Sequence, residues 1–297
     1  MKQTLKWILS IFLTLFILLI GGMTFVYFLS NTRMNRTFPV IEGTISIPTD
    51  VSSKEEGKRL FLSRGCIDCH GKNLAGQVFI DDPAMGRFTG TNLTKGLGGL
   101  EEKTTDFDLA RGIRQGVAFD GRALLFMPSS DFQGMSDEEV GKLIAYIRSV
   151  PPVNHQIEQQ KVGPLARILF VLGELPLLVS ANIINHSVSA PKQVKAALTP
   201  EYGRYVAATC SGCHGPEFSG GPIPGAPPDW PHAQNITSTG IGHWTESNFI
   251  QAIRTGIRPD GSKIRPPMSW QNLGYMNDLE LKAIWLFLNT LPTKTNK

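Results

Sequence analysis

The hydrophobic pattern opens with one long apolar segment. After Lys6 no charged residue occurs until Arg33, and the stretch from Trp7 to Leu29 is predominantly apolar over 23 positions. A helix of this length spans about 34 Å, which is enough to cross a bilayer. A cleaved signal peptide would need small residues at its boundary, yet the first alanine of the chain is Ala75. We therefore expect an uncleaved transmembrane anchor.

Two later segments have the apolar spacing of amphipathic helices. Each begins with a capping residue that has glutamate three positions later, Ser136 in the first segment and Asn277 in the second. Each stops at a proline, Pro151 or Pro292. The pattern predicts two well-defined helices about 140 positions apart.

Shorter helices complete the pattern. The run Ser53-Lys54-Glu55-Glu56 has the form of a capping box and predicts a helix running toward Cys66. Thr199 predicts the start of a second such helix, because proline follows at the first helical position. Helices are also expected over residues 109–116 and 249–256, between loops rich in glycine and other turn-forming residues.

These elements belong to a tandem repeat with an offset of 140 to 144 positions. The sequence Ile113-Arg114-Gln115-Gly116 returns as Ile253-Arg254-Thr255-Gly256, and Asn92-Leu93-Thr94 returns as Asn235-Ile236-Thr237. A repeat of this length is a domain with its own core rather than a solenoid unit, so we expect two all-α domains. The predicted parts are the anchor (1–30), a tether (31–50), domain 1 (51–152), a connector (153–198) and domain 2 (199–297).

The connector is strongly apolar from Ile168 to Val179. A second membrane span would place the two domains on opposite sides, and the charges of Arg167 and Glu174 also disfavour it. Two interpretations remain open. The segment packs between the two domains, or residues 163–187 lie on the membrane surface or against a membrane partner.

All four cysteines lie in two copies of the pentapeptide Cys-x-x-Cys-His. This spacing is typical of c-type haem attachment, in which each thiol adds to one vinyl group and the histidine becomes the proximal iron ligand. A zinc knuckle would need four soft ligands to converge, and a thioredoxin-type pair needs no histidine. The motifs predict two covalently bound haem c groups. The attachment residues are Cys66, Cys69, His70, Cys210, Cys213 and His214.

Composition and compartment narrow the function further. The 297 residues carry a formal net charge of +4, and the haem propionates, which this sum omits, bring the holoprotein close to neutral. No nucleic-acid partner is therefore expected. Covalent haem attachment takes place outside the cytoplasm, so we expect both domains on the outer, periplasmic side of the cytoplasmic membrane.

Each copy resembles a class I c-type cytochrome domain. The phrase Met127-Pro128, the run Met135-Ser136-Asp137-Glu138-Glu139 and the segment from Tyr146 to Pro152 are similar to haem-domain ends in membrane-bound dehydrogenase cytochrome subunits. Those subunits commonly carry three haem domains, whereas this sequence has two. The resemblance implies an N-terminal helix, haem-wrapping loops, a distal methionine and a C-terminal helix in each domain.

Position within this pattern indicates the distal ligands. Met127 follows His70 by 57 positions, and Met268 follows His214 by 54. A thioether favours ferrous iron and, together with histidine, fills both axial positions, which favours electron transfer over catalysis. The expected iron ligands are His70, Met127, His214 and Met268.

The other methionines and histidines are weaker candidates for iron ligands. Met135 and Met276 directly precede helix caps and are expected to pack in the core. Met85 comes soon after the first motif and is a poor second choice as an iron ligand. His232 and His243 lie in loops of domain 2, where they remain alternative ligands or surface groups.

Two further pairs of residues have open roles. Arg114 and Arg254 occupy equivalent places in the repeat, where they either pair with haem propionates or are solvated helix charges. His155 and His186 lie in the connector, outside both haem domains.

The sequence thus predicts a membrane-anchored dihaem cytochrome c that relays electrons outside the cytoplasmic membrane. The donor is expected to be a dehydrogenase or a quinol-oxidising complex, and the acceptor a downstream cytochrome or oxidase. The alternative is a dihaem enzyme, such as a peroxidase or a small-substrate dehydrogenase, which would need one open axial site. A passive haem-bearing assembly subunit is a third alternative.

Overall fold

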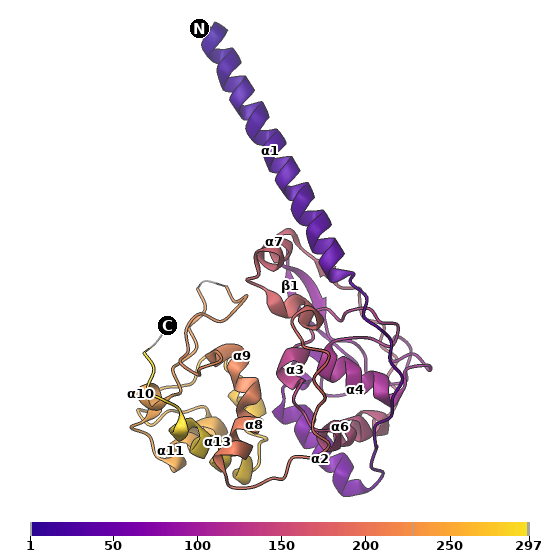
Figure 1. The fold of residues 1–297 in the computed structure, drawn as a ribbon, viewed down its shortest axis with the longest axis vertical. Coiled ribbons are helices and arrows are strands. Elements are labelled where there is room, and N and C mark those ends of the chain that lie inside the picture. The colour runs from indigo at the N-terminus through magenta and orange to yellow at the C-terminus, as the bar shows by residue number, and fades with distance from the viewer. Residues whose placement is uncertain (1, 228, 296–297) are drawn as a thin grey trace.

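The computed structural model describes residues 2–227 and 229–295. A long helix, α1 (Lys2–Met34), projects from a body in which two helical domains lie side by side (Figure 1). Among the described residues α1 is the single unbent helix long and apolar enough to cross a membrane. Its side chains are exposed along nearly the whole length up to Phe28. The apolar helix expected at the N-terminus is therefore present, and it is a candidate membrane anchor.

Domain 1 is organised by the crossing of its first and last helices. α2 (Val51–Ser63) packs across α6 (Asp137–Ser149). At the crossing point a Cβ on Gly57 would collide with the carbonyl oxygen of Lys142, so the two backbones can approach because this position is glycine. The remaining helices of this domain are α3 (Ile67–His70), α4 (Asp106–Gln115) and α5 (Ser129–Phe132).

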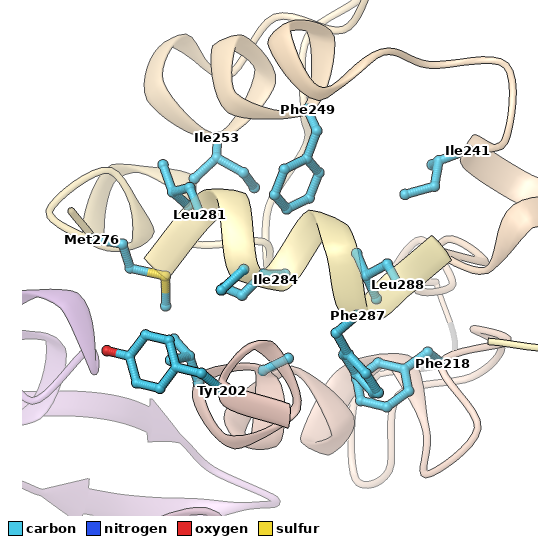
Figure 2. Close-up of a cluster of buried hydrophobic side chains, with 13 residues drawn as sticks. Tyr202, Phe218, Ile241, Phe249, Ile253, Met276, Leu281, Ile284, Phe287 and Leu288 are labelled. Carbon is cyan, nitrogen blue, oxygen red and sulfur yellow. The ribbon is translucent and has the colours of Figure 1, made fainter. Parts of the chain in front are cut away.

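Domain 2 repeats this plan. α8 (Pro200–Val206) packs across α13 (Asp278–Thr290), and Gly203 takes the place that Gly57 has in domain 1. α13 carries Leu281 and Leu288 on the side that faces α11, while Phe287 packs edge-on against Phe218 on the other side (Figure 2). The remaining helices are η2 (Ala207–Cys210), α9 (Ser211–His214), α10 (Ser238–Ile241), α11 (Glu246–Thr255) and α12 (Trp270–Leu273).

The expectation of two helical domains is confirmed, with one addition. Within the described residues, domain 1 also carries a small antiparallel sheet in the order β1-β2-β3. The first two strands form a hairpin in the loop that follows the first cysteine motif, and the third comes from the connector. The strands are β1 (Val78–Asp82), β2 (Gly86–Thr89) and β3 (Lys161–Val162).

Most helix starts agree with the sequence, and one prediction is wrong. The side chains of Ser136, Asn277 and Thr199 each accept the expected backbone N–H and cap α6, α13 and α8. Ser53 does not cap α2. The helix begins at Val51, because Asp50 accepts the N–H of Ser53 at 2.8 Å and already serves as N-cap. Aspartate is as good a cap as serine and here comes first along the chain.

The connector folds onto domain 1 and the foot of α1. Its two helices, α7 (Pro164–Leu172) and η1 (Pro176–Asn182), meet at 59°. Phe170 and Leu178 are buried in one cluster with Phe88 of domain 1 and Met34 of α1. The core that this segment completes belongs to domain 1, and Leu175, at the bend between the two helices, also lies against Gly225 in a loop of domain 2. The segment therefore packs mainly on domain 1 while touching domain 2.

Candidate haem sites

Each cysteine motif forms a single helical turn. In domain 1, Cys66 stands at the N-cap of α3, and its carbonyl oxygen accepts the backbone N–H of His70 at 2.9 Å. Residues 210–214 form the same turn at α9 in domain 2. Glycine follows each histidine with positive φ, 74° at Gly71 and 77° at Gly215, so the chain turns sharply away. The turn keeps both thiols and the imidazole at one place on the domain surface.

Both histidines are held by a backbone carbonyl. The Nδ1 atom of His70 lies 2.8 Å from the carbonyl oxygen of Thr91, and that of His214 lies 2.6 Å from the carbonyl oxygen of Gln234. Nδ1 therefore carries the proton, which leaves Nε2 as the free nitrogen for a metal. Burial lowers the pKa of both imidazoles, although each carbonyl opposes that effect, and the neutral form is the one that binds iron.

The carbonyls that hold the histidines are themselves fixed by an asparagine. Asn92 follows Thr91 and is fully buried, and its side-chain oxygen accepts the N–H of Thr94 at 2.9 Å. Its amide donates to the carbonyl oxygen of Val153 at 2.8 Å, beyond the end of α6. Sequence reasoning missed this role, although the repeated Asn-x-Thr was the signal that could have revealed it.

In domain 2 the motif opens onto an apolar cavity of about 290 Å³. Cys210, Cys213 and His214 line it together with Met268. Much of the remaining wall comes from aliphatic and aromatic side chains of α11 and α13, and Figure 2 shows several of them directed toward one another. A flat, largely apolar group with a metal at its centre fits this donor set and lining. The apolar wall includes Ile236, Ile241, Phe249, Ile253, Ile264, Leu281, Ile284 and Leu288.

In domain 1 the cysteine motif and Met127 pack against two neighbouring hydrophobic clusters. Cys66 packs against the first, which contains Phe61, and Met127 packs against the second, which contains Phe132. Leu100 and Ile113 contact both clusters while remaining partly exposed. The predicted attachment motif and Met127 are thus joined by a shared apolar wall. These residues also fit a haem.

The other methionines are mainly core residues. Met135 and Met276 are buried in the two domain cores, and the Met276 side chain, which also touches the cavity, extends toward Tyr202 (Figure 2). Met85 packs against the connector cluster. Their positions suit core packing.

Two of the four other histidines border the domain 2 cavity. His232 and His243 both line it, although both side chains are exposed. His155 donates from Nδ1 to the carbonyl oxygen of Ala75 at 2.9 Å, and His186 contacts the Phe38 ring. The first pair therefore stays an alternative for iron ligation, whereas the second is engaged in the connector region.

The two equivalent arginines bind the start of the last helix in each domain. Arg114 donates to Asp137 at 2.8 Å and to the carbonyl oxygen of Met135 at 3.2 Å. Arg254 donates to Asp278 at 2.8 Å and to the carbonyl oxygen of Gly274. Neither arginine is simply a solvated helix charge, because each forms an internal ion pair, which joins α4 to α6 in domain 1 and α11 to α13 in domain 2.

The cysteines do not have the surroundings of a zinc site. Burial raises the pKa of the Cys66 thiol to about 12 and that of Cys210 to about 11, whereas zinc binds thiolates. Across residues 2–227 and 229–295, no three His, Cys, Asp or Glu side chains converge to hold a metal ion.

Comparison with known proteins agrees with this geometry. Residues 54–151 and residues 201–292 each match the family model of cytochrome c. The chain belongs to the cytochrome c family, with two such domains, and it carries two covalently bound haem c groups.

Curated relatives are cytochrome subunits of dehydrogenases. The fructose dehydrogenase cytochrome subunit of Gluconobacter japonicus is 28% identical over 272 residues, which cover 82% of this chain and 53% of that protein. The alcohol dehydrogenase (quinone) cytochrome c subunit of Gluconobacter oxydans is 23% identical over 290 residues, which cover 84% of this chain and 59% of that protein. The chain therefore spans between half and two thirds of the length of these relatives.

Proposed function

We propose that this chain is a membrane-anchored carrier that relays electrons between a dehydrogenase or quinol-oxidising complex and a downstream cytochrome or oxidase. Its haem domains would lie on the periplasmic side of the cytoplasmic membrane, where c-type haem is attached. The names of its relatives, cytochrome subunits of fructose and alcohol dehydrogenases, support such a partner. Bound haem would supply a one-electron Fe(III)/Fe(II) couple.

One observation carries the proposal: His214 and Met268 line the same apolar cavity. His214 would hold the iron through nitrogen and Met268 through its thioether, so the chain itself would supply both ligands and leave no open site for a substrate. We assign His70 and Met127 the same roles in domain 1. The thioether stabilises ferrous iron, and the apolar wall excludes water from it. These are properties of a carrier rather than of an enzyme with an open metal site.

The contact between the two domains supports relay from one haem to the other. Shortly after Met268, Asn272 of α12 donates to Asp68 in the first cysteine motif at 2.6 Å. Shortly after Met127, Asp131 of α5 lies against Gly212 in the second motif, where an added Cβ would be 3.0 Å from its carboxylate. Each domain thus places the helix after its methionine on the attachment motif of the other. Such reciprocal contact brings the two attachment motifs, which would hold the haems, toward each other.

The test is ligand replacement at both sites. Iron–thioether bonding produces a weak charge-transfer band at the red end of the oxidised spectrum. We expect Met127→Ala and Met268→Ala each to remove about half of this band and to lower one reduction potential. Each variant should also gain rapid carbon monoxide binding. The spectrum, a potentiometric titration and a flash-photolysis assay measure these effects.

Buried methionines from the same domains provide the controls. Met135→Leu and Met276→Leu keep the core volume and should leave the band intact. If the unmodified protein bound carbon monoxide rapidly and consumed peroxide at roughly 10 per second, the enzyme alternative would replace the carrier. A band of full two-haem strength in Met268→Ala would instead favour Met276, the other thioether that lines the cavity, as the ligand. If the band of the unmodified protein had the strength of one haem only and were unchanged in Met268→Ala, His232 or His243 would be the ligand.

A further inference from the structure

Helix α7 of the connector has three distinct faces. Ala166 and Phe170 point into the buried cluster of domain 1. Arg167 and the backbone carbonyl of Val171 form hydrogen bonds with residues of α1, and Figure 1 shows α7 beside the lower end of α1. The third face carries large aliphatic side chains at positions i, i+3 and i+7, which share one side of a helix. It is formed by Leu165, Ile168 and Leu172.

The second face fixes α7 at the foot of α1. Arg167 stacks over the ring of Tyr27, 4.6 Å from its centroid, and donates to the Ser30 hydroxyl at 2.9 Å. Arg33 in turn donates to the carbonyl oxygen of Val171 at 3.2 Å. These contacts join α7 to the last two turns of α1. Tyr27 is the kind of residue that marks the bilayer interface, so α7 lies at that level.

The third face is uncovered although it is apolar. Leu165 and Ile168 are each 41% exposed, and Leu172 is 69% exposed. Three neighbouring aliphatic side chains in water are unfavourable, and here they lie beside a helix that is itself apolar and exposed. Arg33, at the same level, suits the phosphates of lipid headgroups. Continuity with α1 therefore argues for lipid as the occupant rather than a protein.

We propose that the Leu165, Ile168 and Leu172 face of α7 lies in the interfacial layer of the bilayer that α1 crosses. The inference rests on the proposed anchoring role of α1. A single spanning helix would let the haem domains rotate and tilt, whereas a second contact holds domain 1 in one orientation against the membrane. The connector would then set which haem faces a membrane-bound donor.

A single introduced cysteine can test the contact in the full-length, haem-loaded protein. The four native cysteines are committed to haem, so Leu172→Cys creates one site for an environment-sensitive fluorescent label. The labelled protein is reconstituted in phosphatidylcholine vesicles whose acyl chains either carry bromine or do not. We expect brominated lipid to remove roughly half of the emission at position 172. The ratio between the two lipids cancels quenching by haem, which acts in both.

Two control positions separate this inference from the proposed anchor. Phe16→Cys, in the middle of α1, should be quenched strongly, and Val51→Cys, exposed at the start of α2 on the opposite side of the body, should not be quenched. Ile168→Cys repeats the measurement on the same face if the change at 172 impairs folding. Quenching at 16 without quenching at 168 or 172 overturns the inference and leaves the anchor standing. Absence of quenching at 16 overturns both.

Discussion

At the scale of single residues, each proximal histidine depends on an asparagine that is not an iron ligand. In domain 2 the Asn235 side-chain oxygen accepts the N–H and the hydroxyl of Thr237, at 2.9 and 2.6 Å. Its amide donates to the carbonyl oxygen of Lys294 at 2.7 Å. The preceding residue, Gln234, holds His214. Asn235 therefore ties the loop that orients the histidine to the chain beyond α13.

Asn235→Ala tests this dependence. The change leaves a buried N–H without its acceptor, so we expect a loss of about 1–3 kcal/mol in the stability of domain 2. Because the Gln234 carbonyl is no longer fixed, the potential of the second haem should shift while that of the first stays in place. Thermal unfolding followed at the Soret band and a potentiometric titration measure the two effects. Asn289→Ala is the matched control, since Asn289 is exposed and bonds only within its own helix; equal effects in both variants would contradict the role of Asn235.

At the scale of elements, helix starts could be predicted because they depend on residues close together in the sequence. Elements that depend on partners far along the chain could not be predicted. Ser136 and Asn277 cap their helices because a cap needs only residues within the first turn. β1 and β2 escaped prediction because they are short and gain their third strand from Lys161, far along the chain. The apolar pattern of the connector was visible in the sequence. Its packing on domain 1, however, depends on contacts with Phe88 and Val117.

The haem sites likewise contain residues that the sequence could predict and groups that it could not. The attachment residues could be predicted because Cys66 to His70 and Cys210 to His214 are contiguous motifs. The carbonyls of Thr91 and Gln234 could not, because every residue has a carbonyl and only tertiary structure selects one. The assignment of Met127 and Met268 remains a prediction that spectroscopy must test.

The start of α6 depends on both the connector and domain 2. A helix leaves its first N–H groups without internal partners. Here those of Asp137 and Glu138 donate to carbonyl oxygens of the connector at 2.9 and 3.1 Å. The N–H of Ser136 donates to the hydroxyl of Tyr205 at 2.9 Å, and that hydroxyl donates to Glu139. In a capping box the Ser136 N–H would donate directly to the Glu139 carboxylate. Here the Tyr205 hydroxyl lies between these two groups and joins α8 to α6.

Tyr205→Phe should loosen this junction. Removal of the hydroxyl leaves the Ser136 N–H without its acceptor and takes one donor from the Glu139 carboxylate, which keeps Arg64 at 3.6 Å, at a cost of about 1–3 kcal/mol. The connector bonded to the same helix end should then open more often, and trypsin should cleave faster after the exposed Lys192. Urea unfolding and timed proteolysis measure both. Tyr275→Phe, at a half-exposed ring, should change neither, and unchanged cleavage in Tyr205→Phe would contradict the junction.

At the scale of the whole molecule, two arginines of α2 connect the domains. Arg59 donates to Glu280 of α13 at 2.6 Å, and that carboxylate is 1% exposed. Arg64, at the end of α2, donates to the carbonyl oxygen of Val206 at 3.3 Å and lies 3.6 Å from Glu139. Burial raises the pKa of Glu139, and Arg64 opposes that rise. The interface is thus a buried charge network rather than an apolar seam, which makes it depend on each partner.

Arg64 also lies between the two cysteine motifs. Its side chain is only 4% exposed, and its charge acts on both Cys66 and Cys210, where it lowers the pKa against the larger effect of burial. A buried cation disfavours ferric iron more than ferrous iron, because oxidation adds a positive charge nearby. One side chain should therefore raise the reduction potentials of both haems.

Arg64→Gln is expected to lower both potentials together, each by on the order of 50 mV. Arg64→Lys keeps the charge and should keep both potentials near those of the unmodified protein, although it loses bonds to Val206 and Glu139. A potentiometric titration of the three proteins separates charge from packing. If the reduction potential of only one haem changed in Arg64→Gln, the arginine would act on a single haem. If the lysine variant shifted as far as the glutamine variant, lost packing at the interface would explain the change instead of the charge.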